Sequence, residues 1–264
     1  MPTTPAKPDL FGRPPLAMTE GGNPVWLVIP STKRATTGTT WSVYPEAIVY
    51  VHRSEASAYA ERDPATHAID RGLTPIRNAI LDAAPVGSWV VMLDDDITKV
   101  GHFTNAHRVV HWSGREHLER YLALMSYAEA GGYDLCGEAP TKNPLNYRHG
   151  YSTTTFVEGH CMMCRVTEMR FDEATVVKED YDYLLQLVAA GRGTLRADYL
   201  FSAYNYHTKA GGCFDYRTLA VERAAFEYMM RKWGDWLTPK TGKANTPYEF
   251  TINRAAIARD LGRA

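Results

Sequence analysis

Three short apolar segments in the first part of the chain restrict the possible folds more than any other feature of the sequence. Residues 25–29, 47–51 and 89–93 are rich in β-branched and aromatic side chains, and the first is stopped by Pro30. Each is short enough for a strand and lacks the apolar–polar alternation of a half-solvated one, so each is typical of a strand buried on both faces. Residues 75–84, between the second and the third, have apolar side chains at helical spacing after Pro75. Strands alternating with a helix predict an α/β fold with a mostly parallel central sheet flanked by helices.

The second half of the chain predicts a looser succession of elements. Residues 116–130 have the pattern of an amphipathic helix closed by two glycines, and residues 139–152 have the composition of a loop. Residues 153–166 are strand-like. Residues 180–190 predict a helix capped by Asp180 and ended at a glycine. A short strand is expected at 199–203.

Length and composition are those of an ordinary globular domain. The chain has 264 residues, with 45% hydrophobic and 22% charged residues, which excludes disordered and fibrous classes. Residues 1–24, rich in Pro, Thr and Gly, predict a flexible arm. Residues 216–264 form a mildly basic extension with interleaved aromatic side chains, expected to be helical at first and to pack on the same domain.

Charge and hydropathy bear on partners and location. The formal net charge of −1 predicts no overall attraction for nucleic acid, so any such contact must come from a local patch. The apolar segments are all shorter than the roughly 20 residues of a membrane helix, and no secretory signal is recognisable. We therefore expect a soluble, cytoplasmic protein without membrane contact.

The strongest chemical signal is the run Asp94-Asp95-Asp96, which directly follows the apolar segment 89–93. Open α/β sheets bind their ligands at the carboxyl ends of their strands. In extended backbone Asp94 and Asp96 point to the same side, so one pocket could use both carboxylates for a hard divalent cation and its phosphates. The alternative is a solvated acidic turn, which the preceding buried strand disfavours.

Other candidate residues lie at the expected ends of helices and strands. Arg77, near a helix start, could reach a diphosphate, or could be an ordinary surface arginine. Asp180, with Glu179 beside it, could act as a general base, as a helix cap, or as both. His207 and Lys209 follow the strand at 199–203 and offer a metal ligand and a phosphate-binding cation.

Cysteine usage suggests reduced thiols. The four cysteines are too few for a disulfide scaffold in a chain of this length. Cys161 and Cys164 have zinc-knuckle spacing, but in a strand residues three apart face opposite sides. We therefore expect both to pack in the core.

Taken in order, these motifs resemble the GT-A glycosyltransferases. The motifs are the strand ending at Pro30-Ser31, the helix start at Ile76-Arg77-Asn78, Leu93-Asp94-Asp95-Asp96, Lys178-Glu179-Asp180 and His207. More narrowly, the chain is similar to the TET-associated glycosyltransferases of phages, enzymes that add sugar to 5-hydroxymethylcytosine in DNA. The resemblance covers residues 25–215, which it marks as the GT-A domain.

The resemblance implies a metal-dependent transferase that uses a UDP-sugar and Mn²⁺ or Mg²⁺. It assigns Asp94, Asp96 and His207 to the metal, and Pro30, Ser31, Arg77, Asp95 and Lys209 to the nucleotide sugar. Asp180 would be the catalytic base, with Glu179 as the other candidate. The family's Asp-x-Asp motif is here three consecutive aspartates. A base facing the leaving diphosphate across the sugar implies inversion at the anomeric carbon, with retention still open.

The expected acceptor is DNA, because a duplex base must be extruded and its phosphates held. The candidate acceptor-binding residues are Lys142, Arg148 and His149 in the loop, and Arg231, Lys232 and Trp236 in the tail. The tail aromatics could equally pack the last helix onto the domain.

Three other functions remain open at this stage. Clustered aspartates would also suit a nucleotidyltransferase or another phosphoryl-transfer enzyme. A binding module could hold zinc at Cys161 and Cys164 and grip nucleic acid with its basic tail. A GT-A enzyme could also use a protein or glycan acceptor, because one fold serves many acceptors.

Overall fold

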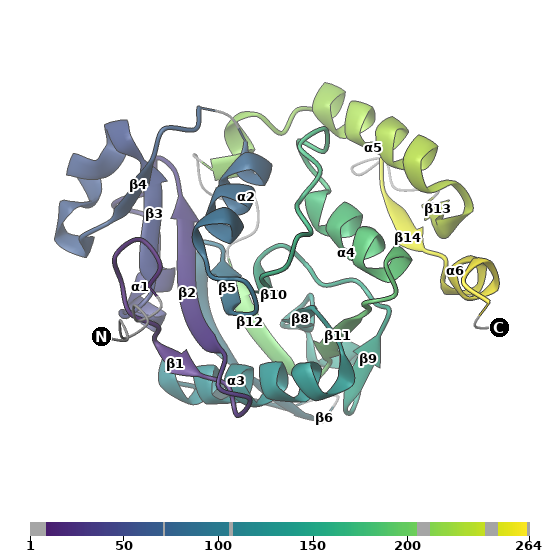
Figure 1. Ribbon diagram of the computed structural model, residues 1–264, viewed down its shortest axis with the longest axis horizontal. Helices are drawn as coiled ribbons and strands as arrows, with labels where there is room; N and C mark the ends of the chain where they lie inside the picture. The colour runs from purple at the N-terminus through teal and green to yellow at the C-terminus, as the bar shows by residue number, and fades with distance from the viewer. Residues whose placement is uncertain (1–8, 71, 106–107, 205–211, 241–247, 263–264) are drawn as a thin grey trace, which may run out of the picture.

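The computed structural model describes residues 9–70, 72–105, 108–204, 212–240 and 248–262. Its main sheet has nine strands in these residues, ordered β4-β3-β2-β5-β10-β8-β11-β9, with β1 added to β2 (Figure 1). The strands are β1 (Ala17–Met18), β2 (Pro24–Ser31), β3 (Ile48–His52), β4 (Ala65–His67), β5 (Trp89–Leu93), β8 (Leu135–Glu138), β9 (Tyr151–Thr153), β10 (Cys161–Arg165) and β11 (Thr194–Ala197).

The three predicted apolar segments form the parallel half of this sheet. β2 pairs in parallel with β3 on one side and with β5 on the other, in register Val28↔Ile48 and Val25↔Trp89. The segments from Trp26 to Ile29 and from Trp89 to Leu93 are fully buried, as continuous apolar strands require. The prediction of an α/β fold with a parallel core is confirmed. β10 runs antiparallel to both β5 and β8, so the sheet is mixed at its centre.

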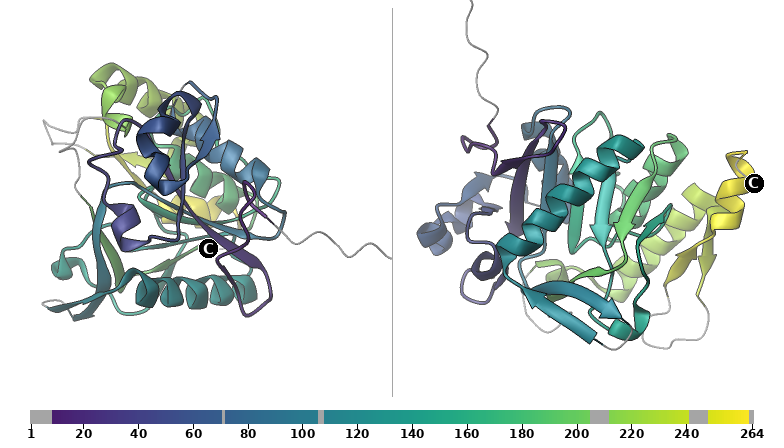
Figure 2. Two further views of the ribbon diagram at one scale, coloured as in Figure 1. Left: turned by 90° about the vertical axis from the view of Figure 1, so that its left-hand side faces the viewer. Right: turned by 90° about the horizontal axis from the view of Figure 1, so that it is seen from below.

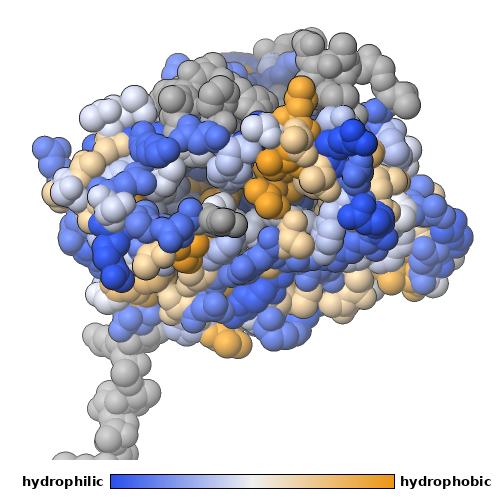
Figure 3. All heavy atoms as spheres, turned by 90° about the horizontal axis from the view of Figure 1, so that it is seen from above, coloured by the Kyte–Doolittle hydropathy of each residue, from blue (hydrophilic) through white to orange (hydrophobic). Residues whose placement is uncertain are grey.

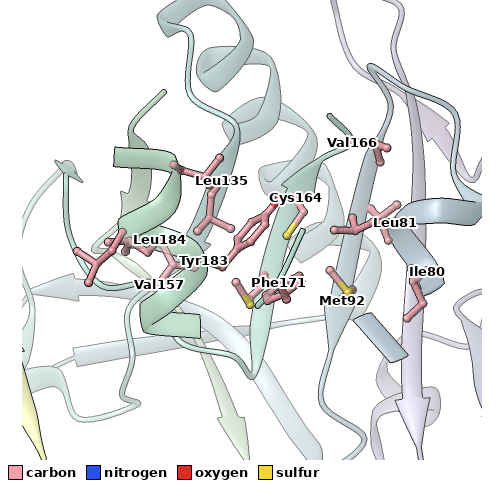
Figure 4. Packing of buried hydrophobic residues seen from close by; sticks show 14 of the residues in the cluster. Ile80, Leu81, Met92, Leu135, Val157, Cys164, Val166, Phe171, Tyr183 and Leu184 are labelled. Atoms are coloured by element: carbon pink, nitrogen blue, oxygen red, sulfur yellow. The ribbon is translucent and has the colours of Figure 1, made fainter. Parts of the chain in front are cut away.

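Helices cover both faces of the sheet (Figures 1 and 2). They include α1 (Thr40–Val43), α2 (Leu73–Ala83), α3 (Gly114–Gly131) and α4 (Glu179–Ala189). α2 and α4 pack on one face, where Leu81, Met92, Cys164 and Tyr183 share a core cluster (Figure 4). α3 packs on the opposite face together with Cys161. Alternation along β10 thus sends its two cysteines into different cores, as the sequence predicted.

Smaller units complete the fold. A second sheet has the order β12-β6-β7, formed by β6 (Ile97–Asn105), β7 (Arg108–Trp112) and β12 (Leu200–Tyr204). The C-terminal part contains α5 (Leu219–Trp233), a hairpin of β13 (Leu237–Pro239) and β14 (Phe250–Ile252), and α6 (Arg254–Asp260). Short 3₁₀ helices are η1 (Arg53–Arg62), η2 (Pro144–Asn146), η3 (Gly212–Asp215) and η4 (Gly234–Trp236). The C-terminal elements join the α2–α4 core through Met229, Leu237 and Phe250.

The local predictions differ from the structure mainly where polar residues dominate. The helices expected at 75–84, 116–130 and 180–190 are present with shifted ends. The stretch 153–166, expected to be one strand, contains only the end of β9 and all of β10, with a loop between them. The hairpin β6–β7 was not predicted, because its strands mix buried and exposed positions without a clean alternation.

Candidate active site

A cavity of about 580 Å³ opens at the carboxyl ends of β2 and β5. The strands supply its first walls, through Pro30 to Arg34 and through Asp94 to Asp96. The loop before β10 and the start of α4 also line it, with Glu158 and Asp180 among their residues. Figure 3 looks onto this end of the molecule, where hydrophilic residues surround a band of hydrophobic ones. The cavity lies where an open α/β sheet is expected to bind a ligand.

The three aspartates after β5 occupy one side of the cavity. Asp95 and Asp96 are buried, and Asp94 is partly exposed. Thr40, at the start of α1, donates its hydroxyl to the Asp94 carbonyl at 2.5 Å and accepts the Ile97 N–H at 2.9 Å. This short helix therefore braces the backbone on both sides of the acidic run.

Asp95 is held by the last residue of β2 and by the segment that follows this strand. Ser31 Oγ donates to Asp95 Oδ2 at 2.5 Å, and Arg34 Nη1 contacts Asp95 Oδ1 at 2.6 Å. The same guanidinium nitrogen lies 3.6 Å from Asp96 Oδ2. Burial alone would lower the pKa of Arg34, but Asp95 and Asp96 outweigh that effect and raise the pKa. The guanidinium thus partly neutralises the acidic run.

Arg77 lies beneath the cavity between two groups of acids. Its side chain is almost fully buried, Nη2 donates to the Gly159 carbonyl at 2.8 Å, and Nε lies 3.6 Å from Glu179 Oε1. Asp94 and Asp180 add to the electrostatic stabilisation of the guanidinium. A buried cation at this position balances the negative charge of both cavity walls.

Asp180 lies in the first turn of α4 and does not cap the helix, which corrects the sequence prediction. The cap position is Lys178, which has a left-handed backbone (φ 69°) and makes no side-chain capping bond. Asp180 Oδ2 instead accepts the Gly159 N–H at 3.0 Å, and Oδ1 accepts the Tyr181 N–H at 2.9 Å. The carboxylate is therefore aimed across to the loop before β10.

Two cavity carboxyls have pKa values near neutrality. Burial raises the pKa of Asp94 to about 7, although Arg77 opposes the rise. Burial, together with Glu179 and Glu158, raises the pKa of Asp180 to about 7. A carboxylate with such a pKa is matched to proton transfer near pH 7. Asp180 is thus electrostatically suited to the role of a general base.

The cavity contains side chains of the chemical type that binds a divalent cation. Asp94 and Asp96 offer the hard carboxylate oxygens that Mg²⁺ and Mn²⁺ prefer. Within the described part of the chain, no three His, Cys, Asp or Glu side chains are grouped to hold a metal ion. His207, the predicted third ligand, lies outside the described residues, as does Lys209.

Comparison with known families identifies the family of the chain. The model of the TET-associated glycosyltransferase family matches residues 25–212, from the start of β2 to the beginning of η3. The chain belongs to the TET-associated glycosyltransferase family. It is therefore a glycosyltransferase, and its donor is a nucleotide sugar. None of the curated proteins matches the chain.

This TET-associated glycosyltransferase contains a buried polar network that the sequence did not suggest. Glu138, 1% exposed at the end of β8, accepts from Tyr121 OH at 2.9 Å and lies 3.0 Å from His160 Nε2. The other nitrogen of His160 lies 3.2 Å from Glu158 Oε2, and Tyr204 OH also donates to that oxygen at 2.9 Å. Glu158 is thus fixed at the cavity wall.

Attraction between a buried cation and two carboxylates stabilises this network. Burial alone would lower the pKa of His160, but its contacts with Glu138 and Glu158 raise it to about 10, so the imidazole is a cation between two carboxylates. Burial lowers the pKa of His117, 3.5 Å from Glu138, to about 4, so it stays neutral. The only sequence signal was Glu158-Gly159-His160 directly before an apolar strand, inside a stretch predicted to be strand.

The predicted acceptor-binding residues lie outside the cavity. Lys142, Arg148 and His149 are exposed on the loop between β8 and β9. In the tail, Lys232 is ion-paired with Asp172 and Asp182, and Trp236 donates to Asp260 while stacking on Trp233. Arg231 is exposed on α5. In the described residues, no helix is long and apolar enough to cross a membrane.

Proposed function

We propose that this enzyme transfers a hexosyl group from a UDP-sugar to the hydroxyl of 5-hydroxymethylcytosine in DNA, with Mn²⁺ or Mg²⁺ as cofactor. The observation that carries the proposal is one cavity in a TET-associated glycosyltransferase that joins Asp94–Asp96 on one wall to Asp180 on the other. The first wall suits a cation and a diphosphate, and the second suits an incoming hydroxyl.

The donor would bind along the carboxyl end of β2. Pro30 and Ser31 line the cavity there, and Ser31 holds Asp95 towards it. A divalent cation on Asp94 and Asp96, with His207 as a third ligand, would stabilise the negative charge that develops on the leaving diphosphate. Lys209 would assist at the same phosphates. Arg77 would act from beneath, by balancing the charge of both walls.

The acceptor would be activated by Asp180. Its carboxylate takes the proton of the hydroxymethyl group while that oxygen bonds to the anomeric carbon and the bond from this carbon to the diphosphate oxygen breaks. Attack from the face opposite the leaving group inverts the anomeric configuration. Glu179, whose Oε1 lies 3.6 Å from Arg77 Nε, is the alternative base. The hydrogen bond from Gly159 N to Asp180 Oδ2 would set the direction of the carboxylate.

Transfer to hydroxymethylated DNA tests the proposal directly. The protein is incubated with UDP-glucose or other UDP-hexoses, MnCl₂ and a duplex containing 5-hydroxymethylcytosine, and the DNA is then digested to nucleosides for mass spectrometry. We expect a nucleoside heavier by one hexose residue, and none when EDTA replaces the metal or when the duplex contains unmodified cytosine. Hydrolysis of the donor without any such product would contradict a DNA acceptor.

The base assignment is tested by paired substitutions. We expect Asp180→Asn to lower the single-turnover transfer rate about 10²-fold or more with saturating donor, because general-base catalysis contributes at this scale. UDP binding should be retained. In the parent, the rate should rise as the pH passes about 7, where Asp180 ionises. A larger defect in Glu179→Gln would move the base by one residue.

A further inference from the structure

Three segments that meet around the second sheet contain no acidic residue, and two of them, 97–112 and 139–153, carry cations. Residues 97–112, 139–153 and 200–204 contain no Asp or Glu, although the whole chain has a formal net charge of −1. Lys99 on β6, Arg108 on β7 and Lys142 on the loop after β8 are all exposed. Positive charge separated in this way from a near-neutral protein creates a local patch for a polyanion.

A groove of about 320 Å³ lies on one side of this sheet. Lys99, Val109, His111 and Lys142 are among its lining residues, and buried Phe201 contributes to it from β12. Phe201 stacks on Phe103 with ring centroids 4.8 Å apart, and its centroid lies 5.9 Å from that of the exposed His111 ring. We call Lys99, His111 and Lys142, which all line this groove, the basic face.

The loop beside the groove is anchored to the sheet. Tyr147, from the same loop as Lys142, packs against Phe103 with ring centroids 6.3 Å apart, and the Ala139 N–H donates to the Leu200 carbonyl at 2.9 Å. The Phe103–Phe201 stack therefore supports both the sheet and the loop. The groove is thus built from packed elements, and its cations are presented on a fixed support.

The basic face begins next to the active-site cavity. β6 starts at Ile97, directly after Asp96, and pairs there with Tyr204, which lines the cavity. Lys99 follows Asp96 by three residues, which in extended chain span about 10 Å. This distance corresponds to the rise of about three base pairs along a duplex. A polymer bound at Lys99 would therefore pass close to the cavity.

We propose that the basic face binds the phosphate backbone of the acceptor DNA beside the reacting nucleotide, an inference that rests on the proposed function. Exposed Lys and Arg side chains gain affinity for DNA by displacing counterions from its phosphates. The basic face has such cations, whereas the tail cation Lys232 is already ion-paired with Asp172 and Asp182. The acceptor is thus placed on the β6–β7 side of the cavity, and not on the C-terminal tail.

The experiment reverses two charges at the groove and two elsewhere. Lys99→Glu with Lys142→Glu alters the basic face, and Arg53→Glu with Arg223→Glu is the matched control on exposed positions of η1 and α5. Binding of labelled duplexes, with and without 5-hydroxymethylcytosine, is followed by fluorescence anisotropy across a series of NaCl concentrations. UDP binding in the presence of MnCl₂ is measured on every variant to verify that the donor site is intact.

We expect the groove variant to bind both duplexes about 10-fold more weakly or worse, because phosphate contacts do not depend on the base. The slope of log affinity against log salt should flatten by about 2, roughly one per lost phosphate contact. The control should stay within about twofold. Unchanged affinity of the groove variant, a larger loss in the control, or binding of heparin but not of DNA would overturn the proposal.

Failure of the proposed function gives a different pattern. A parent protein that binds DNA through the basic face but transfers no sugar to it contradicts the proposed function and supports the DNA-binding face. A parent that glycosylates hydroxymethylated DNA, with equal rates at limiting DNA in the groove variant, supports the proposed function and overturns this inference.

Discussion

At the scale of single residues, two carboxyl groups of the cavity have unusually high pKa values. Asp94 and Asp180 line the cavity and have pKa values of about 7, because burial penalises their charged forms. Such groups are costly for the folded state when they are ionised. The folded protein is therefore less stable than it would be without these carboxyls at the site. This loss of stability can be measured by substituting one residue at a time.

The pH dependence of unfolding should reveal this cost for Asp180. Its folded pKa of about 7 exceeds the ordinary value of 3.8, so its stabilising effect is complete below about pH 4 and is lost as the pH rises through about 7. We expect Asp180→Asn to raise the melting temperature relative to the parent at pH 8 by roughly 2–4 °C, or about 1 kcal/mol. At pH 4 the difference should be smaller.

Differential scanning fluorimetry at the two pH values makes this comparison, with Asp70→Asn as the control at an exposed carboxyl on the cavity rim. Equal differences between variant and parent at pH 4 and pH 8 would show that the ionised form of Asp180 carries no such cost.

Asp96 should affect the donor site without weakening the fold. Its carboxylate adds to the repulsion that raises the pKa of Asp94, so Asp96→Ala relieves strain while it removes a proposed metal ligand. We expect a melting temperature within about 2 °C of the parent and a loss of Mn²⁺-dependent UDP binding. Isothermal titration calorimetry measures the Mn²⁺-dependent binding of UDP, with His207→Ala as a second variant. Parental affinity in both variants would refute the metal assignment.

At the scale of elements, ion pairs hold the C-terminal helix and hairpin against α4. Lys178, at the cap position of α4, lies 2.9 Å from Glu222 Oε2 and 3.7 Å from Glu249 Oε1. Asp182, fully buried, contacts Lys232 Nζ at 2.8 Å and accepts from Trp233 Nε1 at 2.7 Å. Polar contacts thus link the first turn of α4, which carries Asp180, to α5 and to Glu249 beside β14.

Two adjacent cations on α5 should therefore behave differently. Lys232→Ala leaves the buried Asp182 without its ion-pair partner, and we expect a loss of about 1–3 kcal/mol in unfolding free energy. Arg231→Ala, exposed on the same helix, should change stability by less than about 0.5 kcal/mol. Urea titration of both variants measures the difference. Equal stability would show that Lys232 contributes no more than a surface charge.

At the scale of the whole molecule, the network around Glu138 connects the α3 side of the sheet to the active site. His117 and Tyr121 reach Glu138 from α3, and His160 continues from it to Glu158 at the cavity wall. Tyr44 joins the same network through a 2.8 Å contact between its hydroxyl and His117 Nδ1. The position of a cavity carboxylate therefore depends on groups packed in the opposite layer.

Removing the central charge should destabilise the entire fold. Glu138→Gln keeps the shape but leaves the buried His160 cation with one partner, and we expect a loss of about 3 kcal/mol in unfolding free energy. Glu158→Gln, whose side chain is 23% exposed, should cost less, because water can replace part of the contact. Chemical unfolding of the two variants compares them. A smaller loss in Glu138→Gln than in Glu158→Gln would contradict the central role of Glu138.

The sequence by itself determined the parallel core, the helices beside it and the acids at the end of β5. Continuous apolar strands and 3.6-residue periodicity are local signals, because burial on both faces or on one stripe is set by neighbouring residues. The order of the motifs also pointed to the glycosyltransferase family, which the comparison confirmed.

Only the tertiary structure decided which residues meet across the sheet. Ser31 and Arg34 reach Asp95, Gly159 reaches Asp180, and Glu138 reaches His160, in each case from strands or loops far apart in the chain. The hairpin β6–β7 was likewise not recognisable in a sequence of mixed polarity, so Lys142 was predicted to bind the acceptor but its neighbours Lys99 and His111 were not. These contacts depend on strand order and packing, which no local pattern encodes, and the charges they bring together set the pKa values of the site.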